Sequence, residues 1–285
     1  MKFWTDFRPA TGALAALVCF LAVGAAAETT NTLSDAEIQG RQLAQKIISA
    51  IPETNVWLNG LMKIKDGKGT NYNYFFQFGT GRQIQLDTRI QNTSFVWLST
   101  YVFGDTTNVF GAVQSDSKIS DEIATMIIIK HFDSANFPVE YDMTRHWHLG
   151  PASDGIGQIS DKDLSSSVYK QSDFWVADLG LEFFHWPAQK VLPNPTSVKR
   201  GRAYTLLEST NPNPATNGYS RVLSWIDKET GGILEAEAYD FNGRLLKDFA
   251  PKSFKKVNGQ WELQEMEIRN VQTGSRTRLE FDLTK

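Results

Sequence analysis

Residues 219–282 decide the fold, because they contain strand-like runs separated by short turns. They begin YSRVLSWID (219–227) and continue ILEAEAYD (233–240), RLLKDF (244–249), FKKV (254–257), WELQEMEI (261–268) and TRLEFD (277–282). The turns carry Gly231-Gly232, Asn242-Gly243, Asn258-Gly259 and Thr273-Gly274. Such pairs predict tight hairpins, since a two-residue hairpin turn needs positive φ. This half of the chain is therefore predicted to be an antiparallel meander with one long apolar face.

The N-terminus has the three parts of an export signal. Lys2 and Arg8 are basic, residues 12–24 are apolar, and residues 25–27 are all alanine, as signal peptidase requires. The apolar run is shorter than the roughly 20 residues that a membrane-spanning helix needs. We therefore expect residues 1–27 to be a signal peptide cleaved after Ala27, and residues 28–285 to form a single domain in the periplasm.

Composition excludes some classes of function. Taking Lys2, Arg8 and Asp6 from the chain's 29 basic and 32 acidic residues leaves 27 and 31, a net charge of −4 for the mature chain. Nucleic-acid binders carry a dense basic face, so a nucleic-acid partner is not expected. Cys19 is the only cysteine and lies in the signal, so disulfides and thiol chemistry are also not expected.

The region before the meander mixes helices and strands. Ser34 and Glu37 form a capping box, and Ala44, Ile47 and Ile48 with Ile51 make one apolar helix face. Strands are expected at 55–65, 72–78, 82–90, 94–103, 109–113 and 202–209. Residues 150–167 are predicted to be a loop and residues 191–199 a connector.

Two segments of this region are predicted to be helical. Residues 120–130 fit either a helix, capped by Ser120, or a strand, which three consecutive Ile favour, and the helix is preferred. Residues 172–186 are predicted to form one helix capped by Ser172 or Asp173 and ended by Pro187.

The order of these elements resembles the outer membrane lipoprotein-sorting family, in its uncharacterised LolA-like branch. The matching strings are Ser172-Asp-Phe with Asp178-Leu179, Arg221-Val with Trp225-Ile-Asp227, Tyr239-Asp240 with Gly243-Arg and Lys247, residues 255–261, and Thr277-Arg-Leu279. The resemblance implies a mainly β (α+β) fold, an incomplete antiparallel β-barrel whose open mouth is covered by helices. Proteins of that family hold acyl chains between sheet and helices.

One feature departs from the family pattern. The lipoprotein carrier has an Arg-Pro motif on an early strand, whereas Arg82 and Arg89 here have no following proline. The resemblance therefore implies lipid binding in general more than the transfer of lipoproteins.

The predicted groove consists of large apolar residues, because acyl chains bind by non-directional burial of about 0.8 kcal/mol per CH2. A helical lid is expected from residues 179–186, where four large apolar side chains exceed what one packing face needs. Flexible methionines could adapt to varied chains. The predicted lining is Leu58, Met62, Phe76, Phe78, Trp97, Leu179, Phe183, Phe184, Trp186, Trp225 and Met266.

Polar clusters offer weaker alternatives. His146 and His148 would share a strand face, but a pair without a clear third ligand is more typical of a polar surface than of a metal site. Glu235 with Glu237, and Glu265 with Glu267, are paired carboxylates such as glycoside hydrolases use. Arginines at 221, 244, 276 and 278 on neighbouring strands favour cross-strand charge pairs instead. We expect no catalytic residue, no metal and no cofactor.

The preferred hypothesis is a monomeric periplasmic carrier of lipid or lipoprotein acyl chains, taking part in outer membrane lipoprotein sorting. Its partners would be an inner-membrane donor complex and an outer-membrane acceptor. The alternatives are a secreted hydrolase using the paired carboxylates and a structural envelope module that binds a protein at a sheet edge.

Overall fold

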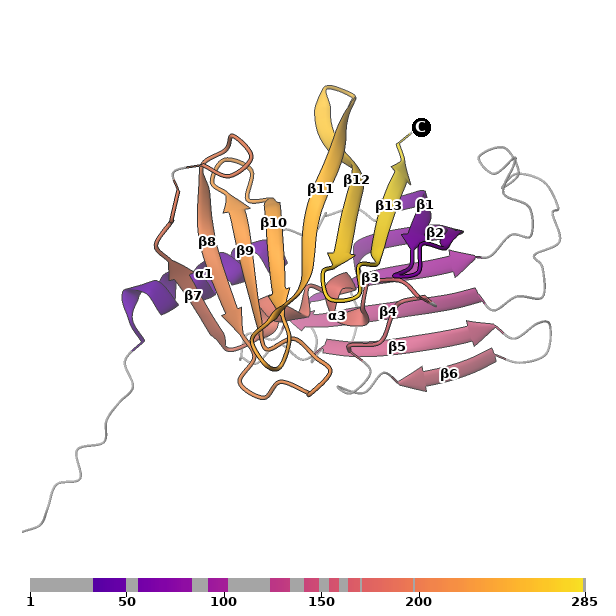
Figure 1. Ribbon diagram of the computed structural model, residues 1–285, viewed down its shortest axis with the longest axis horizontal. Coiled ribbons are helices and arrows are strands. Elements are labelled where there is room, and N and C mark those ends of the chain that lie inside the picture. The colour runs from indigo at the N-terminus through magenta and orange to yellow at the C-terminus, as the bar shows by residue number, and fades with distance from the viewer. Residues whose placement is uncertain are drawn as a thin grey trace, which may run out of the picture. The chain divides into compact units, whose positions relative to one another are not determined.

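A computed structural model describes residues 33–49, 56–83, 92–101, 124–133, 141–148, 154–158, 164–169, 171–196 and 198–283. They belong to one compact unit, Leu33–Lys285. The described strands form one antiparallel 13-stranded sheet in the order β6-β5-β4-β3-β2-β1-β13-β12-β11-β10-β9-β8-β7 (Figure 1). Its strands are β1 (Val56–Lys65), β2 (Asn71–Gln83), β3 (Asn92–Tyr101), β4 (Ala124–Asp133), β5 (Tyr141–His148), β6 (Asp154–Gln158), β7 (Ala188–Leu192), β8 (Tyr204–Thr210), β9 (Arg221–Asp227), β10 (Ile233–Tyr239), β11 (Leu245–Val257), β12 (Gln260–Asn270) and β13 (Arg276–Asp282).

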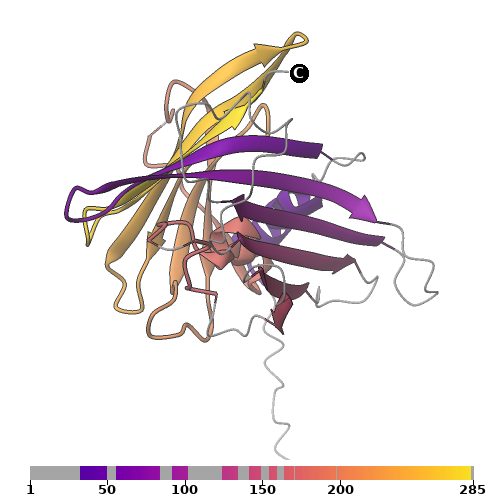
Figure 2. The same cartoon turned by 90° about the vertical axis from the view of Figure 1, so that its right-hand side faces the viewer.

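The sheet is open, with β6 and β7 as its described edges. All neighbours are consecutive in sequence except β1 and β13, which pair from Asn59↔Asp282 to Lys65↔Arg276. Figure 2 shows this junction, with β1 in purple beside β13 in yellow. The prediction of a mainly β fold with an incomplete antiparallel barrel is confirmed.

The hairpin turns follow the predicted chemistry. Asn258 and Gly259, with φ of 49° and 85°, join the paired residues Val257 and Gln260 in a two-residue turn. Gly243 and Gly274 also have positive φ, at 73° and 74°. The meander of residues 219–282 is therefore encoded locally, in its turns.

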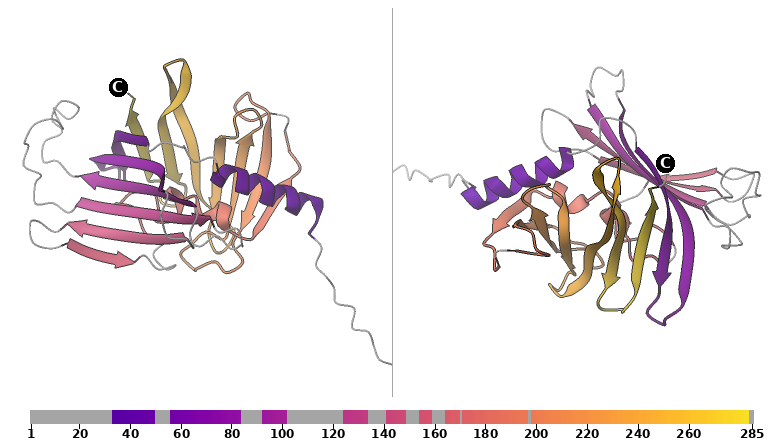
Figure 3. Two further views of the ribbon diagram at one scale, coloured as in Figure 1. Left: turned by 180° about the vertical axis from the view of Figure 1, so that it is seen from behind. Right: turned by 90° about the horizontal axis from the view of Figure 1, so that it is seen from above.

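Helix α1 (Asp35–Ser49) begins at the predicted capping box. The N–H of Ser34 donates to Glu37 Oε2 at 2.8 Å, and the N–H of Glu37 donates to Ser34 Oγ at 3.4 Å. Gly40 and Ala44 are its buried residues. The helix contacts β7, and Figure 3 shows it in indigo beside the strands at that end of the sheet. Within the described ranges, no helix has the length and apolar character that crossing a membrane would require.

Several predicted elements differ from the structure. The helix preferred for residues 120–130 is wrong: its described part lies in β4, where the β-branched run Ile127–Ile129 suits a strand between two others. Residues 244–249 and 254–257 are one strand, β11, bent at bulges near Pro251 and Ser253. β2 continues through Thr80-Gly81, where a turn was predicted.

The segments predicted to be irregular contain edge strands. β6 lies within residues 150–167 and pairs with β5, while β7 includes the start of the predicted connector 191–199. The strands predicted at 82–90 and 109–113 lie largely or wholly outside the described residues.

The single helix predicted for residues 172–186 is wrong. The structure has a short helix α3 (Val176–Leu179) and a 3₁₀ turn η2 (Glu182–His185), separated by Leu181 in the left-handed region at φ 51°. Trp175, not Ser172 or Asp173, is the N-cap, and its N–H donates to Asp178 Oδ2 at 2.8 Å. Asp173 binds the sheet instead, which a helix reading of the sequence could not show.

Candidate functional site

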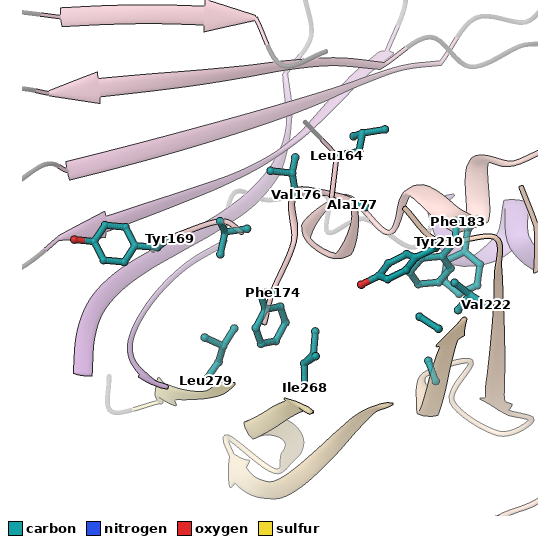
Figure 4. Packing of buried hydrophobic residues seen from close by; sticks show 14 of the residues in the cluster. Leu164, Tyr169, Phe174, Val176, Ala177, Phe183, Tyr219, Val222, Ile268 and Leu279 are labelled. Carbon is teal, nitrogen blue, oxygen red and sulfur yellow. The ribbon is translucent and has the colours of Figure 1, made fainter. Parts of the chain in front are cut away.

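Residues 164–169 and 171–187, here called the plug segment, pack on one face of the sheet. Their backbone bonds tie the segment to itself: the N–H of Val168 donates to Phe174 O at 2.8 Å, and the N–H of Ala177 to Leu164 O at 3.0 Å. Figure 4 shows Phe174 directed toward Leu279 of β13 and Ile268 of β12. The side chains that the plug segment contributes to the main core are Leu164, Val168, Tyr169, Phe174, Val176, Ala177, Phe183, Phe184 and Trp186.

Asp173 attaches the plug segment to β13 and the turn before it. Its carboxylate accepts hydrogen bonds from Ser275 Oγ at 2.5 Å and Thr277 Oγ1 at 3.0 Å, and its backbone N–H donates to Thr277 Oγ1 at 2.8 Å. All three residues are buried. Burial raises the pKa of Asp173, although both hydroxyl donors oppose that shift.

Lys247 of β11 forms the second attachment. Its Nζ donates to the Asp173 backbone carbonyl at 2.6 Å and to Asp178 Oδ2 at 3.4 Å, and lies 3.4 Å from the centroid of the Trp175 ring. The side chain is 3% exposed. Burial lowers the pKa of Lys247 to about 8, and the nearby carboxylates Asp178 and Asp173 oppose the shift.

Tyr219, just before β9, completes this anchor cluster (Asp173, Trp175, Asp178, Tyr219 and Lys247). Its hydroxyl donates to Asp178 Oδ1 at 2.8 Å, and its ring stacks on Trp175 with centroids 4.7 Å apart. Burial raises the pKa of Tyr219 well above its usual value, and the Asp178 charge adds to the rise. The plug segment is thus held by three segments of the sheet region through a few polar contacts.

An apolar cavity of about 70 Å³ lies between the plug segment and the sheet. Among its lining residues, Asp178 has the only carboxyl group and Lys247 the only amine. Ligand pockets typically measure about 300–1,000 Å³, so this cavity is smaller than a usual ligand pocket. Its lining is Phe174, Asp178, Leu181, Phe183, Tyr219, Val222, Ile233, Ala236, Ala238, Lys247, Phe249, Met266 and Ile268.

A second, larger cavity of about 320 Å³ is lined by Trp175, by Tyr219 and by residues of the loop before β9, and it shares Tyr219 with the apolar cavity. Glu182, Asn211 and Asn213 give its wall a polar character. Movement of the plug segment would alter both cavities, because residues of that segment line each of them.

The structure brings together most of the predicted groove residues. Met62, Phe76, Phe183, Phe184 and Trp186 are buried in the main core. Leu179, Phe78 and Met266 pack against it, and Phe183 and Met266 line the apolar cavity. Leu58 is half-buried on β1 outside this cluster, and Trp97 lies on β3, where the backbone pairing alone is described.

Trp225 is not brought together with the other predicted residues. It belongs to a separate cluster with Tyr204 and Leu206, and Lys199 Nζ lies 4.2 Å from its ring centroid. Its strand neighbours Val222 and Ile226 are in the main core, so alternation along β9 places Trp225 on the opposite face.

Sequence reasoning missed Tyr219, Ala236, Ala238 and Lys247 as residues of this site. Lys247 and Asp178 both occur in the strings that carry the family resemblance. Lys247 also alternates with Leu245 and Phe249, and a lysine on the apolar face of a strand was the signal that could have found this site. Small residues such as Ala236 carry no such signal, since alanine is common in any strand or helix.

Two of the four paired carboxylates, Glu235 and Glu267, are engaged in charge pairs, and Glu237 accepts a hydrogen bond from the Tyr239 hydroxyl at 2.7 Å. Glu267 lies 3.1 Å from Arg278 Nη2 and 2.8 Å from Lys252 Nζ, and Glu235 lies 2.8 Å from Lys199 Nζ. Cross-strand pairing is confirmed for Glu267 with Arg278, whereas Arg221 pairs with Glu208 and Arg244 with Asp240. Among the described side chains, no three His, Cys, Asp or Glu residues are grouped to hold a metal ion.

Comparison with known proteins identifies a family. A family model described as an uncharacterised protein matches residues 139–285, just over half of the chain. The chain belongs to this family. No match was found among curated proteins.

Solved structures share the family's fold. A DUF1329 family protein from Desulfovibrio piger is similar with a TM-score of 0.59 and 20% identity, covering 88% of this chain and 92% of that one. A putative outer membrane lipoprotein-sorting protein domain from Vibrio parahaemolyticus has a TM-score of 0.59 and 17% identity, covering 86% and 91%. A LolA superfamily protein from Nitrosomonas europaea has a TM-score of 0.51 and 14% identity, covering 85% and 91%. The fold is therefore LolA-like, as the sequence resemblance predicted.

Proposed function

We propose that this protein is a periplasmic carrier that holds the acyl chains of a lipid or lipoprotein between the plug segment and the sheet. The observation that carries the proposal is the apolar cavity beneath the plug segment, whose wall contains Phe183, Met266 and Ile268. Acyl chains need such a surface, since their binding depends on the apolar area removed from water. The shared fold with a putative lipoprotein-sorting domain supports the same function.

Uptake of a chain requires the plug segment to move. The cavity of about 70 Å³ is below the size of usual ligand sites, so the closed form has no room for a long chain. The plug segment is held by the anchor cluster and by apolar packing, both of which are reversible. An acyl chain would replace the apolar contacts that Phe174 and Phe183 make, and its burial would offset their loss.

The cellular setting belongs to the same proposal. Residues 1–27 would direct export and be cleaved after Ala27, and the mature protein would act as a monomer in the periplasm. A membrane donor would load it and a membrane acceptor would unload it. This carrier needs no catalytic group, and two of the carboxylates that suited a hydrolase, Glu235 and Glu267, are paired with basic side chains.

The decisive experiment measures chain uptake by delipidated protein. The full-length mature protein is titrated with a fluorescent fatty acid below its micelle concentration, and native mass spectrometry identifies what co-purifies with the untreated protein. We expect saturable binding and a co-purifying lipid or acylated peptide. No uptake together with a ligand-free native mass would contradict the proposal.

A pair of substitutions locates the binding site. Ala238→Leu adds three carbon atoms at the wall of the cavity, and we expect it to reduce uptake about tenfold or more by filling the space. Ala188→Leu makes the same change at an exposed position of β7 and is expected to leave uptake unchanged. Equal uptake by both variants would show that chains bind elsewhere.

A further inference from the structure

The β11–β12 hairpin extends beyond the strands on either side of it. β10 pairs with β11 only between Leu245 and Phe249, and β13 pairs with β12 only between Glu265 and Arg269. β11 and β12 nevertheless pair with each other out to Val257↔Gln260. Residues 253–263 therefore form a two-stranded ribbon that has no other strand partner among the described residues. Figures 1 and 2 show it standing out from the sheet.

This ribbon carries the two most exposed large aromatic side chains of the described residues. Trp261 is 70% exposed and Phe254 is 54% exposed. The register pairs Phe254 with Leu263 and Lys256 with Trp261, so all four side chains lie on one face of the ribbon. Large apolar groups gathered on a projecting element mark an interaction site, because an apolar side chain that faces water adds nothing to the stability of the fold.

The charge of the ribbon differs in sign from that of the chain. Residues 253–263 contain Lys255 and Lys256 with Glu262 as the sole acid, a net charge of +1, whereas the whole chain has a net charge of −3. A tryptophan beside lysines suits the interface of a membrane with anionic lipids, where the indole sits at the headgroup level and the ammonium groups meet phosphates. This complementarity favours a lipid surface as the occupant.

We propose that the ribbon tip of residues 253–263 docks on an anionic phospholipid surface, with Phe254 and Trp261 entering the interface. The same two strands continue into the wall of the apolar cavity through Phe249 and Met266. Phe254 is five residues beyond Phe249, about 16 Å along an extended strand. Docking would hold the cavity close to the membrane. The inference goes beyond the carrier function, since the ribbon could dock whether or not the cavity binds a chain.

The test measures binding of the full-length mature protein to vesicles. Co-sedimentation at low salt compares large unilamellar vesicles of equimolar phosphatidylcholine and phosphatidylglycerol with vesicles of phosphatidylcholine alone. We expect binding to the anionic vesicles and quenching of tryptophan fluorescence by brominated phosphatidylglycerol. The double substitution Phe254→Ser with Trp261→Ser should lower partitioning about tenfold or more, since two aromatic side chains no longer leave water.

Two controls separate this surface from other effects. Phe241→Ser removes an aromatic side chain that is 49% exposed at the turn before β11, the opposite end of that strand, and should leave vesicle binding unchanged. Lys255→Gln with Lys256→Gln should lower anionic-vesicle binding by about fivefold per lysine. All variants should keep the wild-type unfolding midpoint and the wild-type uptake of free fatty acid, which is measured without vesicles.

The outcomes are distinct from those of the carrier test. Loss of vesicle binding in the double variant, with normal fatty-acid uptake, supports ribbon docking. No vesicle binding by the wild type, or equal binding by the double variant, overturns it. If residue 261 of the ribbon could be cross-linked to an envelope protein and the protein bound no vesicles, ribbon docking on lipid would also be overturned, in favour of a protein partner.

Discussion

Lys247 is the residue whose environment most constrains the site. Its amine is almost completely buried, yet it donates to Asp173 O and to Asp178, which also accepts from Tyr219 Oη. Removing one partner of a buried ion pair leaves the other charge without compensation, which is more harmful than replacing the pair together. Lys247 therefore holds the plug segment to β11 through its hydrogen bonds, and its amine offsets the charge of Asp178.

The first prediction concerns loss of that amine. Lys247→Met keeps a long apolar side chain but leaves Asp178 without its cation, and we expect the free energy of unfolding to fall by about 3 kcal/mol. Urea denaturation followed by circular dichroism measures it. Lys256→Met, at an exposed position of the ribbon, is the control and should change stability by about 0.5 kcal/mol or less. Equal stability of the two variants would mean that the anchor cluster does not stabilise the fold.

The second prediction concerns pH. Burial lowers the pKa of Lys247 from 10.5 to about 8 in the folded protein, so between these values the unfolded chain binds more protons than the folded one. Linkage then makes the free energy of unfolding rise with pH across that window, by at most about 1.4 kcal/mol per pH unit from this group. The stability of the wild type relative to Lys247→Met, measured by urea denaturation between pH 8 and pH 10, should therefore increase. A difference that stays constant over this range would contradict the buried environment of the amine.

At the scale of elements, helix α1 can lie close to β7 because Gly40, at their contact, has no side chain. A Cβ at Gly40 would lie 2.5 Å from Lys190 N and 2.6 Å from Gln189 C, which are backbone atoms of β7 and cannot turn aside. The helix therefore approaches β7 more closely than any other residue at position 40 would allow. β7 in turn contacts the plug segment through Gln189, whose side-chain amide donates to Phe183 O at 2.8 Å and Trp186 O at 2.9 Å.

The third prediction tests this close approach. Alanine is the better helix former by about 1 kcal/mol, so Gly40→Ala would stabilise an isolated helix. The clash with β7 opposes that gain, and overpacking of this kind costs about 1–3 kcal/mol. Because the clashing atoms are backbone, we expect a net loss of stability, seen as a lower urea midpoint. Gln39→Ala changes an exposed residue of the same helix and should not lower the midpoint. A stabilised Gly40→Ala protein would show that α1 moves freely against β7.

At the scale of the whole described unit, the plug segment is the part that can move without breaking the sheet. The sheet is continuous through backbone pairing from β6 to β7, and the first strand β1 pairs with the last, β13. By contrast, the described hydrogen bonds from the plug segment to the sheet come chiefly from Asp173, Lys247, Tyr219 and Gln189. Local opening favours regions with fewer cooperative contacts, so ligand entry should affect this segment first.

The fourth prediction follows for the whole protein. A ligand that binds the folded state alone stabilises it by mass action, by about 2.7 kcal/mol at a free concentration 100 times its Kd. Fatty acid should therefore raise the urea midpoint of the delipidated protein, and hydrogen exchange of residues 164–187 should change more than that of β8 and β9. The Ala238→Leu protein provides the control and should show neither effect. An unchanged midpoint in the wild type at saturating probe would contradict binding in this cavity.

Local signals determined much of this protein without its tertiary structure. Asn258-Gly259 and Gly243 specify their turns because positive φ is a property of the residue and its neighbours. The Ser34–Glu37 box specifies the start of α1 in the same way, since both partners are within three residues. The strand order of the meander follows from short connections, and the ordered strings carried the resemblance to the LolA-like fold.

Only the tertiary structure decided the elements and faces that depend on distant partners. Residues 172–186 have the spacing of a helix, but Asp173 binds Ser275 and Thr277, about a hundred positions away, and the segment becomes a plug. Trp225 and Ile226 are both buried, so alternation along β9 does not say which of them faces the plug segment. Lys247 becomes an anchor because Asp178 and Tyr219 are brought to it by the fold. Backbone conformation at a turn depends on neighbouring residues, whereas burial and charge pairing depend on which segments the folded chain places together.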